Sequence, residues 1–219
     1  MSLPALIIGA GGHARVLIEA LTKSGALIQG CVAKEAPIRW PPSIPFLGDD
    51  EALLSHTPSS IVLINGIGST ARPDLRRDIF LRFKQKGYYF GTVVHPAAIL
   101  PSDVVLGEGA QVMAGAILQP GCRVGCNAIV NTGAVVDHDC QIGAHVHIAP
   151  GAVLSGDVTV GEGGHVGTGA RVIQGVAIGA GAVVGAGSTV LRDVPPSARV
   201  AGVPARPLRA TDQSDEACR

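Results

Sequence analysis

One histidine stands between two carboxylates in the segment Asp137-His138-Asp139. An imidazole titrates near neutral pH, so it can take a proton from an amine or a hydroxyl that attacks a thioester carbonyl. Asp139 could accept a hydrogen bond from the ring, fix its tautomer and raise its basicity, with Asp137 as the competing partner. We therefore take His138 as a candidate general base for acyl transfer.

A glycine-rich turn at residues 9–14, reading GAGGHA, follows an apolar strand that ends at Ile8 and opens a helix. Such a turn brings backbone amides and a helix N-terminus close to a phosphate or another polar ligand. It also fits the dinucleotide fingerprint, which requires an acidic residue near the end of the second strand, where Ala33 and Lys34 stand. Three interpretations stay open: a nucleotide-sugar site, which we favour, a dinucleotide site, and a structural turn without a ligand.

A hexapeptide repeat must position His138. Every sixth residue from Val94 to Val190 is aliphatic, without an insertion, and small or β-branched residues recur four positions later. Most hexads place Gly, Asn or Asp at the third position after the aliphatic residue, which suits a tight corner with positive φ. Three hexads make a triangular coil of eighteen residues, whose strands pair in parallel with the next coil. Asp139 occupies such a corner position, so a purely structural role for it is equally open.

The repeat also predicts which residues point outward. One outward line contains the aliphatic residues Ile99, Ile117, Val135 and Val153, and such a line indicates an interface between subunits. A second line contains two histidines one coil apart and reads Gln111, Ile129, His147, His165, Val183. The pattern resembles the left-handed β-helix of hexapeptide-repeat acyltransferases. Because ordinary crossovers are right-handed, the left hand is implied by the resemblance alone.

Before the repeat, strands and helices alternate. Strands are expected to Ile8 and at 27–32 and 61–64, with helices through Ser24 and at 72–86, so the sequence predicts a small parallel, Rossmann-like α/β sheet. We expect a nucleotide-sugar-binding domain at 1–92, the β-helix at 93–208 and a disordered tail at 209–219.

Composition excludes several classes of protein. The 17 basic and 17 acidic residues balance, with no basic cluster, which argues against a nucleic-acid partner. The apolar run Leu3–Ile8 is too short for a membrane span or a signal peptide. Five cysteines, an odd number, argue against a disulfide framework, and we expect a cytoplasmic protein in which Cys122 and Cys140 fill the interior of the coils.

Three motifs together resemble the NeuD family of bacterial sugar acyltransferases. They are Gly-Gly-His-Ala at 11–14, Asp-His-Asp at 137–139 and Gly-Val-Pro-Ala-Arg at 202–206, within a resemblance that spans residues 3–208. It implies an acetyl-CoA-dependent N-acetyltransferase that acts on the amino group of a nucleotide-linked 4-amino sugar in glycan or O-antigen biosynthesis. It also implies a homotrimer and no metal.

The resemblance assigns roles residue by residue. It implies that His138 is the catalytic base, that Asp139 increases its basicity, and that His147 contacts the thioester end of acetyl-CoA. The rest of the acetyl-CoA site is expected at Gly156, Thr168, Ala186, Gly202 and Ala205, and the nucleotide-sugar site at Gly11, Gly12, His13, Gly68 and Asn131. Family members often carry acidic residues where this chain has Ala33 and Lys34. The resemblance therefore supports the acetyl-CoA site more strongly than it supports recognition of a uridine base.

Other functions remain open from the sequence. The same base and donor would serve a sugar O-acetyltransferase of the sialic-acid type, and a solenoid with a degenerate site could be a non-catalytic sugar-binding scaffold. A zinc hydratase like the hexapeptide-repeat carbonic anhydrases needs three converging imidazoles, and the stacked pair His147 and His165 has no obvious third partner. His145 occupies a positive-φ corner, where a structural role is expected.

Overall fold

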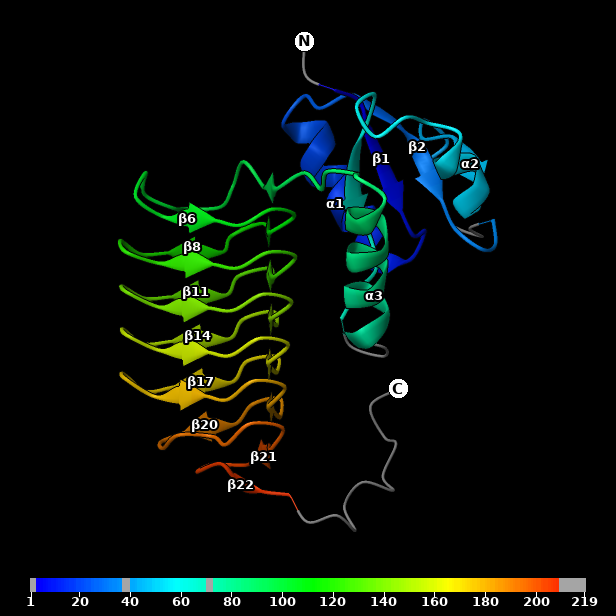
Figure 1. Cartoon of the computed structure of the whole chain (residues 1–219). Helices are drawn as coiled ribbons and strands as arrows, with labels where there is room; N and C mark the ends of the chain where they lie inside the picture. Colours follow the sequence, from blue (N-terminus) through cyan, green and yellow to red (C-terminus); the bar gives the residue numbers. More distant parts are fainter. Residues whose placement is uncertain (1–2, 37–39, 70–72, 209–219) are drawn as a thin grey trace.

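The computed structural model of the chain describes residues 3–36, 40–69 and 73–208. Two parts follow each other in the sequence, a small α/β sheet and a tall stack of coils (Figure 1). The predicted disordered tail at 209–219 lies outside the described residues. No helix within the described ranges is long and apolar enough to cross a bilayer.

The first part is the small parallel sheet that the sequence predicts. Its strand order is β3-β2-β1-β4, and all neighbouring strands run parallel. The elements are β1 (Ala5–Ile8), α1 (Gly12–Lys23), β2 (Ile28–Val32), β3 (Phe46–Gly48), α2 (Asp50–Leu54), β4 (Val62–Asn65) and α3 (Pro73–Gln85).

Two short elements, β3 and α2, were not predicted. β3 has 3 residues and pairs with β2 across an irregular register, so it carries no alternating apolar pattern. α2 has 5 residues, and the side chain of Asp49 caps it by accepting a hydrogen bond from the Glu51 N–H. Elements this short depend on their neighbours more than on their own sequence.

The second part is the parallel β-helix that the hexapeptide repeat predicts, and its three sheets are the three faces of a triangular prism. Face 1 contains β5 (Val93–Val94), β7 (Gln111–Val112), β10 (Ile129–Val130), β13 (His147–Ile148), β16 (His165–Val166), β19 (Val183–Val184) and β21 (Arg199–Ala201), with β22 (Arg206–Pro207) antiparallel at its end. Face 2 contains β8 (Ile117–Leu118), β11 (Val135–Val136), β14 (Val153–Leu154), β17 (Arg171–Val172) and β20 (Thr189–Val190). Face 3 contains β6 (Val105–Leu106), β9 (Arg123–Val124), β12 (Gln141–Ile142), β15 (Thr159–Val160) and β18 (Ala177–Ile178).

The chain runs from face 1 to face 2 to face 3, so we name the corners 1–2, 2–3 and 3–1. Backbone hydrogen bonds between coils place each residue beside the one eighteen positions later, as in the pairs His147 with His165 and Val135 with Val153. The predicted outward lines are therefore confirmed. The interior contains only aliphatic and small side chains among its buried residues, including the predicted pair Cys122 and Cys140.

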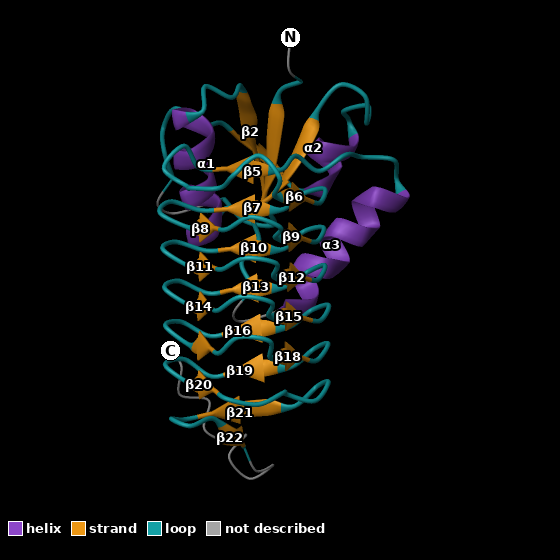
Figure 2. Ribbon diagram, turned by 90° about the vertical axis from the view of Figure 1, so that its left-hand side faces the viewer, coloured by secondary structure: helices purple, strands orange, loops and turns teal. Residues whose placement is uncertain are grey.

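The α/β part packs on face 1 and corner 3–1. Val93 and Met113 at the top of face 1 are buried with Leu17 of α1 in one apolar cluster. On α3, the Phe80 ring meets the His145 ring edge-on, with 5.5 Å between centroids. Figure 2 shows α1 on the side of the face 2 strands and α3 on the side of the face 3 strands. Corner 2–3 is consequently the edge of the prism that points away from the α/β part (Figure 1).

Candidate functional site

His138 lies at corner 2–3, two residues after the end of β11, with its side chain 50% exposed. Its Nδ1 is 2.9 Å from Oδ2 of Asp139, which itself adopts the positive-φ corner conformation with φ of 62°. Asp137 is engaged elsewhere, because its Oδ1 accepts a hydrogen bond from the backbone N–H of His138 at 2.7 Å. Since a carboxylate only accepts, the Nδ1 carries the proton and the Nε2 lone pair is available for a substrate proton.

The carboxylates around His138 set its basicity. The hydrogen bond to Asp139 is the main cause that raises the pKa of His138; desolvation, the second cause, lowers this pKa, and the charges of Asp137, Asp139 and Asp157 raise it. A higher pKa makes the ring a stronger base. It also means that, at any given pH, a larger fraction of the His138 rings is already protonated and cannot accept a proton from the substrate.

Gly156 lies directly beneath the His138 ring, one coil further along. A Cβ at Gly156 would collide with Nε2 and Cε1 of His138, so the imidazole occupies the space that the missing side chain leaves. Gly156 has an ordinary backbone conformation for any residue, since it is not among the glycines with positive φ. Glycine is therefore needed here to make room for the ring, and Gly156 belongs with His138 and Asp139.

The glycine turn lies at the carboxyl ends of the parallel strands β1 and β4. Gly11 and Gly12 are exposed, and α1 begins there without a side-chain cap or an acidic residue in its first turn. Gly68, in the loop after β4, faces His13, because a Cβ on Gly68 would lie 3.7 Å from the Cβ of His13. Four of the predicted nucleotide-sugar residues are thus together beside free backbone N–H groups, where an anion is stabilised.

Two histidines beside this turn are held neutral. His13 Nε2 lies 2.8 Å from Oε1 of Gln111, and burial, followed by the charge of Arg76, lowers the pKa of His13 to about 4. Burial also lowers the pKa of His147 to about 3, with smaller contributions from His165, His13 and Arg76. His147 is 3% exposed, and its Nε2 lies 3.1 Å from Nδ2 of Asn131. Because the charge of His13 acts on His147, His147 and its partner Asn131 lie on the same side of the β-helix as the glycine turn.

The remaining predicted acetyl-CoA residues follow corner 1–2 toward the end of the prism. Thr168 and Ala186 are exposed one coil apart, joined by the hydrogen bond from the Gly187 N–H to the Thr168 carbonyl at 2.8 Å. Below them, the carbonyl of Thr189 accepts from the Ala205 N–H at 2.8 Å, and the Gly202 carbonyl accepts from the Thr189 N–H at 3.0 Å. Asn131 stands on the same corner about two coils above Thr168, since the Gly151 N–H bonds the Thr132 carbonyl and the Gly169 N–H bonds the Pro150 carbonyl.

One chain does not bring all of the predicted site residues together. His138, Asp139 and Gly156 lie at corner 2–3, which is opposite face 1 in the triangular cross-section. The glycine turn contacts face 1 through His13 and Gln111. The filled interior of the β-helix therefore separates the candidate base from the candidate nucleotide-sugar site.

Sequence reasoning missed three buried polar residues behind the glycine turn. Arg76 is 2% exposed and donates to the carbonyls of Asn65, Ile67 and Asn127 at 2.9, 2.7 and 3.2 Å. Asn65 and Gln111 join the same network. Gln111 gave a signal in the sequence, because it is a polar residue in the same outward line as His147 and His165, whereas nothing in the sequence around Arg76 distinguishes it from an exposed helix residue.

His145 and His165 lie away from the candidate base His138 and its partner Asp139. Nδ1 of His145 is 2.9 Å from Nδ2 of Asn127, and the ring packs on Phe80, which agrees with the structural role expected of this corner. His165 packs against His147 with 5.0 Å between ring centroids. Within the described residues, no three His, Cys, Asp or Glu side chains are grouped closely enough to hold a metal ion.

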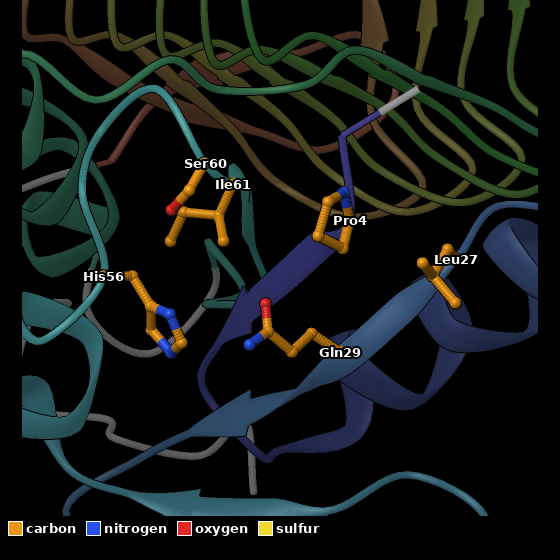
Figure 3. Close-up of a pocket in the computed structure, with 6 residues that line it drawn as sticks. All are labelled: Pro4, Leu27, Gln29, His56, Ser60 and Ile61. Atoms are coloured by element: carbon orange, nitrogen blue, oxygen red, sulfur yellow. The ribbon is translucent and has the colours of Figure 1, made fainter. Parts of the chain in front are cut away.

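A separate cavity of about 400 Å³ opens at the amino ends of β1, β2 and β4 (Figure 3). Its walls are formed by Pro4, Leu27, Gln29, His56, Ser60 and Ile61. This is the opposite edge of the sheet from the glycine turn, and none of the predicted site residues lines it.

Family comparisons match both parts of the chain. A family model described as the PglD N-terminal domain matches residues 5–83, and one described as bacterial transferase hexapeptide (six repeats) matches residues 121–156. A comparison with curated protein sequences gives no match.

Solved structures resemble nearly the whole chain. A histidine-to-asparagine variant of perosamine N-acetyltransferase from Caulobacter crescentus, in complex with CoA and GDP-perosamine, is 41% identical, with 94% of this chain and 97% of that chain covered and a TM-score of 0.88. The acetyltransferase domain of PglB from Neisseria gonorrhoeae, in complex with acetyl coenzyme A, is 34% identical, with coverages of 94% and 98% and a TM-score of 0.88. WeeI from Acinetobacter baumannii, 24% identical over 94% of this chain and 100% of that chain, has the same fold with a TM-score of 0.84.

Replacing Asp139 by Asn should lower the pKa of His138, because the ring loses the carboxylate that accepts from Nδ1. Titration of the His138 ring signals by NMR measures this directly. Asp137→Asn is the matched control and should lower the pKa less, since Asp137 bonds the backbone rather than the ring. An equal or larger effect of Asp137→Asn would contradict the assignment of Asp139 as the partner.

Proposed function

The chain belongs to the NeuD-type hexapeptide-repeat sugar acetyltransferases, and we propose that it transfers the acetyl group of acetyl-CoA to the amino group of a nucleotide-linked 4-amino sugar. The observation that carries the proposal is the His138–Asp139 pair, whose Nε2 is free to take a proton at the surface of a β-helix. The relatives in complex with CoA and GDP-perosamine support both substrates, and a GDP-linked amino sugar is our first choice of acceptor.

In the proposed reaction, the sugar amine attacks the thioester carbonyl carbon, and Nε2 of His138 accepts the proton that the nitrogen loses. The C–S bond then breaks, and the CoA sulfur leaves as a thiolate that is protonated by the imidazolium or by water. Asp139 stabilises the imidazolium through its bond to Nδ1. A positioned general base of this kind contributes about 10² to 10⁴ in rate, and no acyl-enzyme is needed.

The active assembly that we propose is a homotrimer in which face 2 of each copy lies toward the three-fold axis. The aliphatic line on face 2 supports this, since Ile99 is 62% and Val153 36% exposed in the single chain. Corners 2–3 and 1–2 flank face 2, so packing around the axis would bring corner 2–3 of one copy against corner 1–2 of the next. His138 would then face the glycine turn of a neighbour.

This arrangement gives acetyl-CoA a groove between two copies. One wall would be corner 2–3 with His138 and Gly156, and the other would be corner 1–2 with Thr168 and Ala186, ending near Gly202 and Ala205. His147, which lies near the top of that second wall, remains our candidate for the contact at the thioester end.

We also place the reaction in the cytoplasm. Support comes from the cysteines, since all four that the structure describes are free thiols, as expected in a reducing compartment.

His138→Ala should reduce kcat for acetyl transfer by about 10² to 10⁴, because the amine loses its proton acceptor. Release of free CoA thiol in the presence of acetyl-CoA and UDP-, GDP- or dTDP-linked amino sugars measures the activity. His56→Ala is the control, because His56 lies in the cavity at the far edge of the α/β sheet. Near-normal turnover of His138→Ala would remove the base assignment, and no turnover of any amino sugar by the wild type would remove the proposed function.

Val153→Glu should dissociate the trimer without unfolding the chain, because a charge would be buried at the proposed axis. Light scattering after gel filtration should give three times the chain mass of 22.2 kDa for the wild type and a smaller species for the variant. Thr159→Glu places the same charge at an exposed position of face 3 and should stay trimeric. A monomeric wild type would contradict the proposed assembly.

A further inference from the structure

Gln111 is a buried amide between the two parts of the chain, and both of its polar atoms are used. It is 0% exposed on β7, its Nε2 donates to the backbone carbonyl of Asn65 at 2.9 Å, and its Oε1 lies 2.8 Å from Nε2 of His13. Gln111 therefore connects the end of β4 with the start of α1, on either side of the glycine turn. None of the roles assigned above includes it.

The partner on the Asn65 side decides the orientation of the amide. A backbone carbonyl can only accept a hydrogen bond, so the atom of Gln111 that faces it must be the NH₂ group. Oε1 then faces His13, and because an amide oxygen can only accept, Nε2 of His13 must carry the proton. In neutral His13 this leaves Nδ1 without a proton, as a hydrogen-bond acceptor.

Nδ1 of His13 is the ring nitrogen that remains available. It makes no hydrogen bond to the described residues, and it is not among their fully buried polar atoms that lack a partner, so part of its surface is open to solvent on the side of the ring away from Gln111. The ring stays neutral at ordinary pH, because burial and Arg76 together lower the pKa of His13 to about 4.

The groups around His13 favour this neutral state. Arg76 of α3 and His147 of β13 are the charged or titratable side chains that interact with it from the other elements, and the only side chain that hydrogen-bonds it among the described residues is Gln111. No carboxylate of the described residues forms an ion pair with it.

We propose that Gln111 is a positioning residue that holds His13 in the Nε2-protonated tautomer, so that Nδ1 accepts a hydrogen bond from a hydroxyl group of the nucleotide-sugar. This inference rests on the proposed function and adds which group of the substrate His13 recognises. A phosphate oxygen is an acceptor and cannot pair with an acceptor nitrogen. The diphosphate is therefore left to the free backbone N–H groups at the start of α1, and His13 selects a hydroxyl of the ribose or of the sugar.

The tautomer can be read in the free protein. In the ¹⁵N spectrum of histidine-labelled wild type, with His13 assigned from the signal that His13→Gln removes, we expect a protonated Nε2 and an unprotonated Nδ1. A protonated Nδ1 would overturn the proposal. This measurement needs neither a substrate nor activity, so it is independent of the proposed function.

Gln111→Glu tests the consequence for binding. The carboxylate should raise the pKa of His13, so that Nδ1 becomes a donor as the pH falls, and binding should weaken at acid pH. Affinity for GDP-perosamine, measured calorimetrically, should be nearly constant for the wild type from about pH 5.5 to 8 and should fall at least about tenfold over that range for Gln111→Glu. GDP alone is the second probe: a matching loss assigns the hydroxyl to the ribose, and a loss confined to GDP-perosamine assigns it to the sugar.

Gln29→Glu is the matched control, because it introduces the same carboxylate beside the cavity at the far edge of the sheet, and its binding should not depend on pH. KM for acetyl-CoA should stay within about twofold in Gln111→Glu, which a general loss of structure would not allow. Folded Gln111→Glu with wild-type affinity at every pH would overturn the inference. If the wild type bound GDP-perosamine without acetylating it, the proposed function would fail while this inference stood.

Discussion

Backbone hydrogen bonding between successive coils is the constraint on which the rest of the structure depends. It holds each residue beside the one eighteen positions later, and the three faces leave no freedom to shift this register without moving every inward side chain outward. The His138 ring can lie over Gly156 because the same corner repeats beneath it. The same register gathers the exposed aliphatic residues of face 2 into one line between two corners.

The triangular cross-section then separates the candidate base from the candidate nucleotide-sugar site. A corner that lies opposite a face cannot reach a ligand bound on that face, because the packed interior of the prism is between them. The α/β part is held on face 1 by apolar contacts of Met113 and Phe80 and by the buried polar network of Arg76. Burying a guanidinium is costly unless its N–H groups are satisfied, and three backbone carbonyls accept from Nε and Nη1 of Arg76, whereas Nη2 has no partner among the described residues. The position of the glycine turn follows from this packing.

The charge of Arg76 also affects the protonation of the two histidines beside the glycine turn. Together with burial, it lowers the pKa of His13 and of His147, so both rings are neutral. Neutral rings would contact a ligand through hydrogen bonds and not through a positive charge. At corner 2–3 the pKa shift has the opposite direction, since exposed carboxylates raise the pKa of His138. The chain thus contains neutral imidazoles where a polar ligand would be recognised and a more basic one where a proton would be taken.

Much of this could be predicted from the sequence because the repeat is local. The outward lines through Val135 and His147 follow from counting in sixes, and the same count places His138 at an outward position. The choice between Asp137 and Asp139 required coordinates, since both neighbours of the histidine carry a carboxylate and only the backbone conformation of the corner selects one. Arg76 and Gln111 are 35 residues apart in numbering and meet through the docking of two folded parts, which no local pattern encodes. The short elements β3 and α2 were missed for a related reason, because they form only against β2.

The central claim is that the base of one chain serves the glycine turn of another, and mixed assemblies test it most directly. His138→Ala removes the base, and Gly11→Trp should block the turn without strain, since a Cβ at Gly11 meets no atom within 4 Å. Each variant alone should be nearly inactive, whereas trimers formed at random from equal amounts of both should regain about one quarter of wild-type activity, the chance that an intact base meets an intact turn across an interface. Activity no greater than the residual activities of the two separate variants would show that base and turn act within one chain.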